Sequence, residues 1–396
     1  MQPLPVDEQH MRSGLIPRLF LLAWLSGVAV AVRAADAPGE PLALSRAHAA
    51  WTTLERNQGR TLPGTVLIEP TRTVEASLGF AAELPNLIPT SWVAYAAIPP
   101  TLPSQRLLAF NISPRTMQVS DERVPSRKLL MALSSASAGD DSHTLKMGAF
   151  YRVQLFKRTL IDGSFKSQGL SDCCLAPPDE LAPALAPTET LDFDTPAFQD
   201  AVAQNDLRPH PGEMELDFVR RVFTTLKTQL HYEYRADLER RSSAVWRTRT
   251  SDCGGLNGLF AAVLRANGIP ARVLCGRWAR SATDGEMLGG VPYAQWHVKA
   301  EFYLPRVGWI PADLSGAVQC TPHNDTGLAY FGNDHGDFIT MHTDFDLEVD
   351  ALRLGHQHIL ANQGFAYWVT GTGTMTGQSS HEIWKVRELS GVVAAR

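Results

Sequence analysis

Residues 248–276 read TRTSDCGGLNGLFAAVLRANGIPARVLCG, a stretch in which a cysteine stands at the expected start of a helix. Its residues 250–252 are Thr-Ser-Asp, which favour the N-cap position, and Cys253 follows them directly. A thiol in the first turn of a helix faces unpaired backbone N–H groups and the positive end of the helix dipole, and both favour the thiolate. The stretch therefore places Cys253 where it can act as a nucleophile.

The remainder of the stretch predicts the helix itself and the strand that follows it. One face of the helix is apolar at helical spacing, which indicates packing against a core: Leu256, Leu259, Phe260, Val263 and Leu264. Asn267 and Gly268, followed by Pro270, predict the end of the helix. Residues 271–276 are then expected to form a strand that contains Cys275.

His297 is the candidate base for this thiol, because a Cys nucleophile needs a partner to take or share its proton. It lies in residues 295–304, which alternate apolar and polar side chains and so predict a strand. The apolar set is expected to face the core: Trp296, Val298, Ala300, Phe302 and Leu304. The polar set is expected to face solvent or a cleft: His297, Lys299, Glu301 and Tyr303. A base on such a strand is held rigidly and stays accessible.

Asp313 is the candidate group that orients the imidazole. A turn at residues 305–308 returns the chain as a second strand, in which Asp313 is the only carboxylate. Because the turn residues centre slightly after Pro305, we expect Asp313 to lie diagonally from His297, or beside a bulge, rather than directly opposite. A lone buried Cys or a lone strand His is usually structural, but the three residues together favour catalysis.

Four segments of the chain, in this order, resemble the core of the transglutaminase-like superfamily: residues 252–255 (DCGG), 265–273 (RANGIPARV), 295–297 (QWH) and 308–313 (GWIPAD). The resemblance covers roughly residues 212–315. It implies a papain-like thiol fold in which Cys253 is the nucleophile, His297 the base and Asp313 the orienting acid. Residues 331–338 also resemble bacterial exported members of the family, which implies that the region before the core is an accessory domain.

The same resemblance implies thiol-dependent acyl transfer on amide bonds through a thioester intermediate. Hydrolysis, as in a peptidase, amidase or deamidase, is the expectation for a bacterial exported member, with peptide, protein or cell-envelope amides as substrates. Two alternatives stay open: protein-glutamine cross-linking by a transglutaminase, and a catalytically idle module that binds peptides or envelope polymers. Animal cross-linking members use calcium, but no cofactor or metal is expected here. Turn formation explains Asn333, Asp334 and Asp337 at least as well as a metal loop does.

Composition and the N-terminus point to an exported globular protein. The 396 residues are 44% hydrophobic and 19% charged, which are globular values, and the net charge of −5 argues against binding to nucleic-acid phosphates. Arg12 and Arg18 are followed by an uncharged apolar run at 19–32 and by small residues up to Ala34. Residues 1–34 therefore predict a signal peptide, with an uncleaved membrane anchor as the alternative. We expect a periplasmic or secreted protein with no stable membrane span after signal cleavage.

The expected fold class is α+β, with a papain/transglutaminase-like cysteine-catalytic core preceded by a β-rich, sandwich-like domain. Residues 35–170 are expected to form that β-rich domain. They contain short apolar runs separated by Pro and Gly, such as residues 65–68 and 91–95, and an alternating segment at 151–160.

The second half of the chain begins with a change in composition. Residues 171–211 are rich in Pro, Ala and Asp and predict a linker or a surface loop. Residues 212–396 are expected to form the transglutaminase-like catalytic domain, which opens with an amphipathic helix at 214–230.

Four further cysteines accompany Cys253, which makes an odd total for an exported protein. They are Cys173, Cys174, Cys275 and Cys320. Adjacent cysteines do not suit the Cα separation of a disulfide, so Cys173 and Cys174 are not expected to bond each other. The sequence leaves the other pairings open, and Cys275 is a candidate for either the core or a disulfide.

Overall fold

The computed structural model describes residues 62–114, 116–124, 126–135, 143–165, 178–235, 237–283, 287–288, 291–292, 295–305 and 307–389. Residues 1–34, predicted as a signal peptide, lie outside these ranges, as do Cys173 and Cys174. Within the described ranges, no helix is long and apolar enough to span a membrane.

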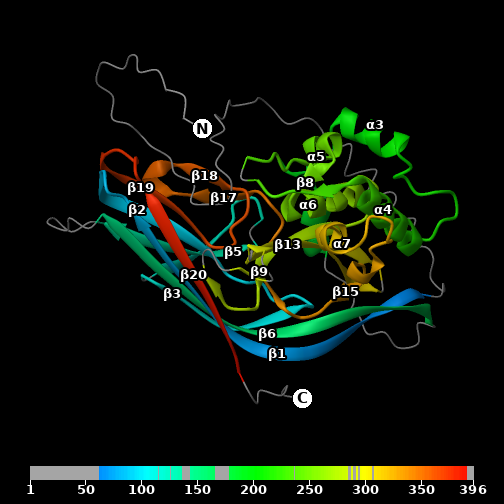
Figure 1. Cartoon of the computed structure of the whole chain (residues 1–396), viewed down its shortest axis with the longest axis horizontal. Helices are drawn as coiled ribbons and strands as arrows, with labels where there is room; N and C mark the ends of the chain where they lie inside the picture. The colour runs from blue at the N-terminus through cyan, green and yellow to red at the C-terminus, as the bar shows by residue number, and fades with distance from the viewer. Residues whose placement is uncertain are drawn as a thin grey trace.

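Three larger sheets organise the fold (Figure 1). The first has the order β10 (Ala282–Thr283), β20 (Ser379–Glu388), β1 (Leu62–Glu83), β6 (Thr144–Phe165) and β15 (Asn333–Asp334), with β3 (Gln105–Ser113) also paired to β6. The second has the order β19 (Phe365–Gly373), β2 (Leu87–Ala97), β5 (Lys128–Ser135) and β4 (Thr116–Ser120). The third, called the core sheet below, has the order β14 (Gly308–Ala312), β13 (Trp296–Leu304), β9 (Ala271–Trp278) and β16 (Phe338–Thr343).

The remaining strands are short and lie in pairs: β7 (His231–Tyr232) with β8 (Thr250–Ser251), β11 (Met287–Leu288) with β12 (Val291–Pro292), and β17 (Leu347–Asp350) with β18 (His356–Ile359). The α-helices are α2 (Pro178–Leu181), α3 (Pro196–Gln204), α4 (Glu215–Gln229), α5 (Ser242–Thr248), α6 (Cys253–Arg265) and α7 (Leu314–Cys320). Short 3₁₀ turns are η2 (Pro183–Leu185), η3 (Leu328–Tyr330) and η4 (Leu352–Leu354).

The first two sheets form the β-rich part that the sequence predicts. Segments 65–68, 91–95 and 151–160 fall within β1, β2 and β6, as expected. Alternate residues of β1 are buried, which gives this strand one apolar face: Val74, Ala76, Leu78, Phe80 and Ala82. That face packs in one apolar cluster with residues of β2, β5, β6 and β19. Burial between two sheets is therefore what stabilises this part of the chain.

The last two strands of the chain complete these β-rich sheets. β20 pairs antiparallel with β1, and β19 pairs antiparallel with β2. The predicted boundary at residue 212 therefore does not separate the sheets, because residues 365–373 and 379–388 return to the β-rich part. Pairing between segments so distant in sequence leaves no mark on local periodicity.

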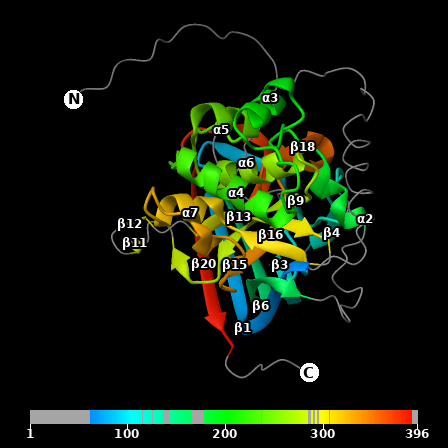
Figure 2. The same cartoon turned by 90° about the vertical axis from the view of Figure 1, so that its right-hand side faces the viewer.

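Helices α4 and α6 pack on the core sheet, and the long strands β1 and β6 pass along its other side (Figures 1 and 2). The amphipathic helix predicted at 214–230 is α4, and its apolar stripe is buried. Helix α6 begins at Cys253, as its sequence predicts, and all its later residues are buried. The rings of Phe223 and Phe260 join the two helices edge to face, with centroids 5.6 Å apart.

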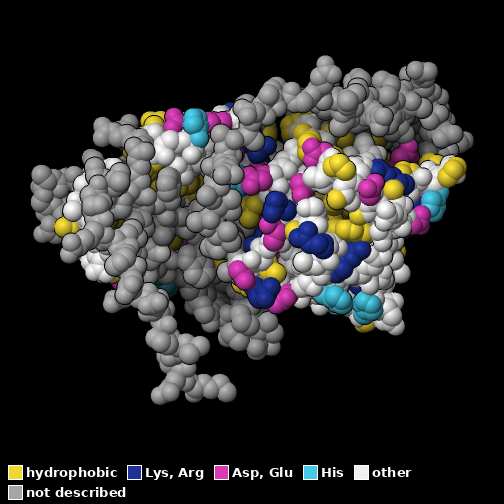
Figure 3. Space-filling view, turned by 90° about the horizontal axis from the view of Figure 1, so that it is seen from above, with side chains coloured by type: hydrophobic (Ala, Val, Ile, Leu, Met, Phe, Trp, Pro, Cys, Tyr) yellow, Lys and Arg dark blue, Asp and Glu magenta, His cyan; other side chains and the backbone are white. Residues whose placement is uncertain are grey.

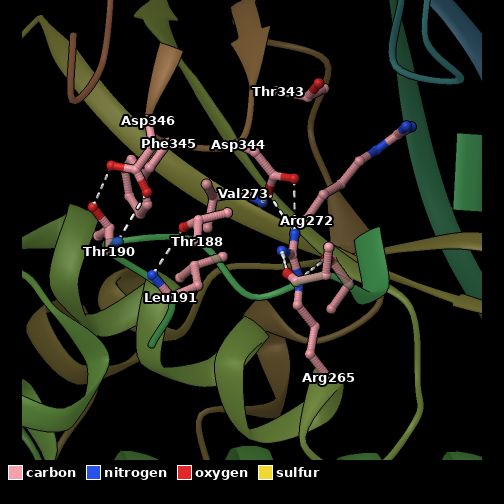
Figure 4. Close-up of polar contacts among 12 residues, drawn as sticks. Thr188, Thr190, Leu191, Arg265, Arg272, Val273, Thr343, Asp344, Phe345 and Asp346 are labelled. Atoms are coloured by element: carbon pink, nitrogen blue, oxygen red, sulfur yellow. Dashed lines mark hydrogen bonds and ion pairs between the residues drawn. The ribbon is translucent and has the colours of Figure 1, made fainter. Parts of the chain in front are cut away.

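Residues 178–211, predicted as a linker or surface loop, are folded onto this core instead. Their buried apolar side chains join the cluster of α4 and α6: Leu191, Phe193, Phe198, Val202 and Leu207. Figure 4 shows a polar anchor in this segment, where Thr190 donates from its N–H and Oγ1 to Asp346 at 2.9 and 2.7 Å. The surface prediction is wrong here because Pro-rich composition marks turns but does not reveal the apolar contacts between them.

Helix α6 is fixed at both ends by the segment after β16. Arg265, in the last turn of α6, donates to both carboxylate oxygens of Asp344 at 2.7 and 2.8 Å (Figure 4). Asp344 and Asp346 both have left-handed backbone conformations, with φ of 59° and 61°. Between them, the Phe345 ring lies against Gly258, where an added Cβ would come within 3.1 Å of it. The first turns of α6 thus rest on a closely fitting side chain.

The face seen from above carries both signs of charge. Lys and Arg side chains are interspersed there with Asp and Glu (Figure 3). Exposed ion pairs of the protein include Arg241 with Glu239 at 2.8 Å and Arg235 with Glu233 at 3.3 Å. Exposed pairs of this kind contribute little to stability.

Candidate active site

Cys253 is the first residue of α6, and its side chain is half-buried with a free thiol. Asp252 is the N-cap: its Oδ1 accepts from the backbone N–H groups of Gly254 and Gly255 at 3.0 and 3.2 Å. Its other oxygen, Oδ2, accepts from Arg240 Nε and Nη2 at 2.9 and 2.5 Å. The negative charge beside the thiol is thereby balanced by a guanidinium, and the cap leaves the Cys253 N–H unused.

A side chain at Gly255, in the first turn of α6, would clash with its neighbours. A Cβ at Gly255 would lie 2.1 Å from Ser251 Oγ and 3.0 Å from Val245 Cγ2. Any larger residue would therefore push the start of α6 away from the strand before it. The position of Cys253 therefore depends in part on Gly255, which has no side chain in the same turn.

His297 lies on β13, only 9% exposed, with its ring held on several sides. Its Nε2 donates to Asp313 Oδ2 at 2.7 Å. The Trp278 ring stacks on the imidazole, with centroids 4.8 Å apart and planes 21° from parallel. Phe338 meets the imidazole edge to face at 6.1 Å. Trp278 is a site residue that the sequence did not reveal, because only the pairing of β9 with β13 brings it beside His297.

Asp313 follows β14 directly and is the N-cap of α7. The register of β13 with β14, in which Ala300 faces Ala312, places His297 diagonally from Asp313, as predicted. The Oδ1 atom of Asp313 accepts from the Gly316 N–H and from Ser315 Oγ, each at 2.8 Å. One carboxylate therefore caps a helix with one oxygen and holds the imidazole with the other.

The electrostatics of the pair favour a charged imidazole. Burial alone opposes the imidazolium, but the Asp313 carboxylate, together with a hydrogen bond to the Cys253 thiol, raises the pKa of His297 to about 10. Burial likewise opposes the Asp313 anion, but His297, followed by Lys299, lowers the pKa of that carboxyl well below its usual range. Because Asp313 occupies Nε2, Nδ1 is the ring nitrogen left for the thiol. The site can thus hold a protonated imidazole next to Cys253, ready to act as an acid.

The structure brings Cys253, His297 and Asp313 together, but it corrects the expected surroundings of β13. The polar face of that strand was expected to meet solvent or a cleft, yet Lys299, Glu301 and Tyr303 are all buried. Strands β6 and β15 cover this face: Arg158 Nη1 contacts Glu301 Oε2 at 2.7 Å, and Lys299 Nζ contacts Asp334 Oδ1 at 3.4 Å. The period of two correctly identifies the strand, but it cannot say what covers each face.

Residues 333–337 make contacts with the protein's own groups. Asp334 accepts from the Gly336 N–H at 3.1 Å and pairs with Arg158 and Lys299. The contact between Asp334 and Gly336 is a turn contact, as the turn interpretation expects, but Asn333 and Asp334 themselves form strand β15. Among the described residues, no group of three or more His, Cys, Asp or Glu side chains is arranged to hold a metal ion.

Tyr232 is a second residue near the thiol that sequence reasoning missed. Its strand, β7, pairs in parallel with β8, so that Tyr232 lies opposite Ser251, two residues before Cys253. Burial, followed by the charge of Cys253, raises the pKa of Tyr232, and its phenol remains a hydrogen-bond donor at neutral pH.

The described cysteines are all free thiols. Cys253, Cys275 and Cys320 form no disulfide. Cys275 is fully buried on β9, and burial raises the pKa of its thiol well above the ordinary value, so it is a core residue. Cys320, at the end of α7, is exposed.

Comparison with known proteins identifies this part of the chain. Residues 205–314 match the family described as the transglutaminase-like superfamily. No curated protein is matched by the sequence. One similar solved structure is a Cytophaga hutchinsonii protein provisionally described as a cysteine protease, with 13% identity, a TM-score of 0.47, and coverage of 83% of this chain and 94% of that one. Another is the periplasmic domain of TgpA from Pseudomonas aeruginosa, with 19% identity, a TM-score of 0.31, and coverage of 59% and 73%. The chain therefore carries a transglutaminase-like core at residues 205–314, a segment that includes Cys253, His297 and Asp313.

Proposed function

We propose that the protein is a thiol enzyme that transfers acyl groups from amide bonds, with water as the acceptor. The observation that supports this most is a half-buried thiol at the start of α6 whose electrostatic partner is a histidine, which is itself held by a buried aspartate at 2.7 Å. In this proposal Cys253 is the nucleophile, His297 the acid and base, and Asp313 the residue that orients His297.

The proposed reaction has two steps. The Cys253 sulfur attacks the amide carbonyl and forms a thioester, the C–N bond breaks, and the His297 imidazolium gives its proton to the leaving amine. Water then attacks the thioester and loses a proton to His297, the C–S bond breaks, and a carboxylic acid leaves. This restores the Cys253 thiolate and the His297 imidazolium. The Cys253 N–H is available to stabilise the oxyanion in both steps, because Asp252 engages the next two N–H groups of the helix.

The substrate class in this proposal is a peptide or protein amide, with cell-envelope amides included. We further propose that the enzyme works outside the cytoplasm, in the periplasm or as a secreted protein, after removal of residues 1–34. Support for that location comes from the charged and apolar pattern of the first 34 residues.

An electrophilic acyl probe tests the chemistry, with Cys253→Ala as the inactive variant and Cys320→Ala as the matched control. We expect labelling of the wild type and of Cys320→Ala, mapped to the peptide that contains Cys253, and none at that position in Cys253→Ala. The control matters because Cys320 is an exposed thiol that reacts without any catalytic partner. Labelling confined to Cys320 would support an idle binding module instead.

A primary amine added to the acyl-enzyme separates hydrolysis from cross-linking. Hydrolysis predicts release of free acid at a rate that the amine leaves unchanged. Incorporation of the amine into the product in place of water would assign the cross-linking reaction.

A further inference from the structure

Asn257 is the buried polar side chain with the widest set of contacts around the site. It lies on α6 one turn after Cys253 and is fully buried. Its Nδ2 lies 2.7 Å from the Val298 carbonyl oxygen, 3.2 Å from Asp313 Oδ1 and 2.9 Å from Ser315 Oγ.

Two further contacts involve the backbone at the two ends of the same site. Nδ2 also lies 3.3 Å from the carbonyl oxygen of Cys253, and Oδ1 of Asn257 accepts from the Leu314 N–H at 2.9 Å. One side chain therefore touches Cys253 itself, the residue after His297, and Asp313 with the residue after it. These groups come from α6, β13 and the start of α7, which are elements that the chain forms far apart in sequence.

We propose that Asn257 is a positioning residue that sets the distances among Cys253, His297 and Asp313. The inference rests on the proposed function, because it concerns the geometry of that catalytic group.

The amide chemistry suits this task. An amide carries both N–H donors and a carbonyl acceptor, so it can bind the Val298 carbonyl, the Asp313 carboxylate and the Leu314 N–H at the same time. A carboxylate at this position could not donate to Asp313, and an apolar side chain would leave the buried Val298 carbonyl without this donor. Hydrogen bonds to a charged partner are also stronger than neutral ones, so the contact with Asp313 resists displacement.

Oδ2 of Asp313 accepts from His297, so only Oδ1 is left to fix the position of the carboxylate. The donors on Oδ1 are Gly316 and Ser315, both within its own helix cap, and Asn257. The first two can only hold Asp313 relative to α7. Asn257 is the donor that relates Asp313 to the helix that carries the thiol.

The turn that ends the same helix offers a control in Asn267. Its Nδ2 donates to the carbonyl oxygens of Leu207 and Val263 at 2.9 and 2.8 Å, so it too joins α6 to another segment, but at the far end of the helix. Asn257→Ala and Asn267→Ala therefore remove the same amide from two places that differ in whether Asp313 is a partner.

The first measurement is the rate of iodoacetamide alkylation at Cys253 at neutral pH, read by mass spectrometry of the Cys253 peptide. We expect at least a roughly tenfold slower reaction in Asn257→Ala, the effect of one lost hydrogen bond to a charged group. Asn267→Ala is expected to stay within about twofold of the wild type, as a site outside the network should. An equal loss in both variants, or no loss in Asn257→Ala, would overturn the proposal.

The second measurement is the NMR titration of the His297 imidazole. A displaced Asp313 stabilises the imidazolium less, so its midpoint should fall in Asn257→Ala and stay unchanged in Asn267→Ala. An unchanged midpoint in a folded Asn257→Ala protein would mean that Asn257 is only structural.

Ser315→Ala keeps the test decisive if Asn257→Ala does not fold. It removes one donor to Asp313 and one partner of Asn257, and we expect a smaller change in the same direction. Where Asn257→Ala does fold, the effects of Asn257→Ala and Ser315→Ala should be less than additive in the double variant, because both act through Asp313. If the wild-type Cys253 reacts no faster than Cys320, the proposed function fails rather than this inference.

Discussion

Arg158 of β6 and Glu301 of β13 form an ion pair of 2.7 Å in which both side chains are completely buried. Glu301 also accepts from Arg272 Nε at 2.7 Å, so one carboxylate lies between two guanidinium groups. β13 is the strand that carries His297. The pair thus joins the β-rich part of the protein to the strand on which the candidate base stands.

Removing Glu301 should strongly destabilise the protein. In Glu301→Gln, the buried Arg158 and Arg272 lose their shared counter-charge, and loss of one partner of a buried pair costs about 3–5 kcal/mol. The free energy of unfolding, from urea denaturation, measures this. Glu69→Gln is the control, because Glu69 pairs with Lys157 at the surface and should change stability by less than about 1 kcal/mol. Equal effects of the two substitutions would contradict the importance of the buried pair.

Replacing Asp313 should change the titration of His297. The carboxylate is what raises the pKa of His297 to about 10 against the effect of burial, so in Asp313→Asn that pKa should fall towards or below its ordinary value. The NMR titration of the imidazole reports this, with His297→Gln used to assign the signal. Asp325→Asn, in a turn where Asp325 accepts from the Gly327 N–H, should leave the titration unchanged. A His297 titration midpoint near 10 in Asp313→Asn would mean that a group other than Asp313 stabilises the imidazolium.

The stability that the His297–Asp313 pair provides should depend on pH. The folded pKa of His297 is raised above the unfolded value of about 6.5, so its contribution is complete below pH 6.5 and is lost as pH rises towards 10. The pKa of Asp313 is lowered, so its contribution is present above about pH 4 and is lost as pH falls further. The difference in unfolding free energy between the wild type and Asp313→Asn should therefore be largest between about pH 4 and 6.5. If this difference in unfolding free energy instead grew from pH 6.5 to 10, it would contradict the raised pKa of His297.

Gly255→Ala should disturb the start of α6. The added Cβ would meet Ser251 Oγ at 2.1 Å, and relief requires movement of the turn that carries Cys253. We expect a loss of about 1–3 kcal/mol in stability, the usual cost of overpacking, together with slower alkylation of Cys253. Gly148→Ala is the control, since the Cβ there would meet its nearest neighbour at an ordinary 3.7 Å. Adding Ser251→Gly to Gly255→Ala should restore part of both losses.

The sequence was most informative where a feature depends on neighbours along the chain. The Asp252 cap, the apolar spacing of α6 and the alternation of β13 are local, and each predicts an element that the structure contains. The turn after Leu304 also predicts the diagonal placement of Asp313 relative to His297, because a hairpin register follows from its turn.

Contacts between distant segments could be decided only by the tertiary structure. Trp278 reaches His297 through strand pairing, and Asn257 reaches Asp313 through the packing of α6 against α7. Nothing in the local pattern of either residue distinguishes it from an ordinary core side chain. The pairing of β20 with β1 and the burial of residues 178–211 belong to the same class.

Cys253 depends both on the local sequence and on contacts between distant segments. Its place at the start of a capped helix is determined by the amino acids on either side of it. Its partner, however, is a histidine whose charge is set by burial, by Asp313 and by the strands that cover β13. The neighbouring residues determine the position of the thiol on its helix, and the packing of distant segments determines the charge of the histidine beside it. The reason is that electrostatic interactions depend on distance and burial in space rather than on separation along the chain.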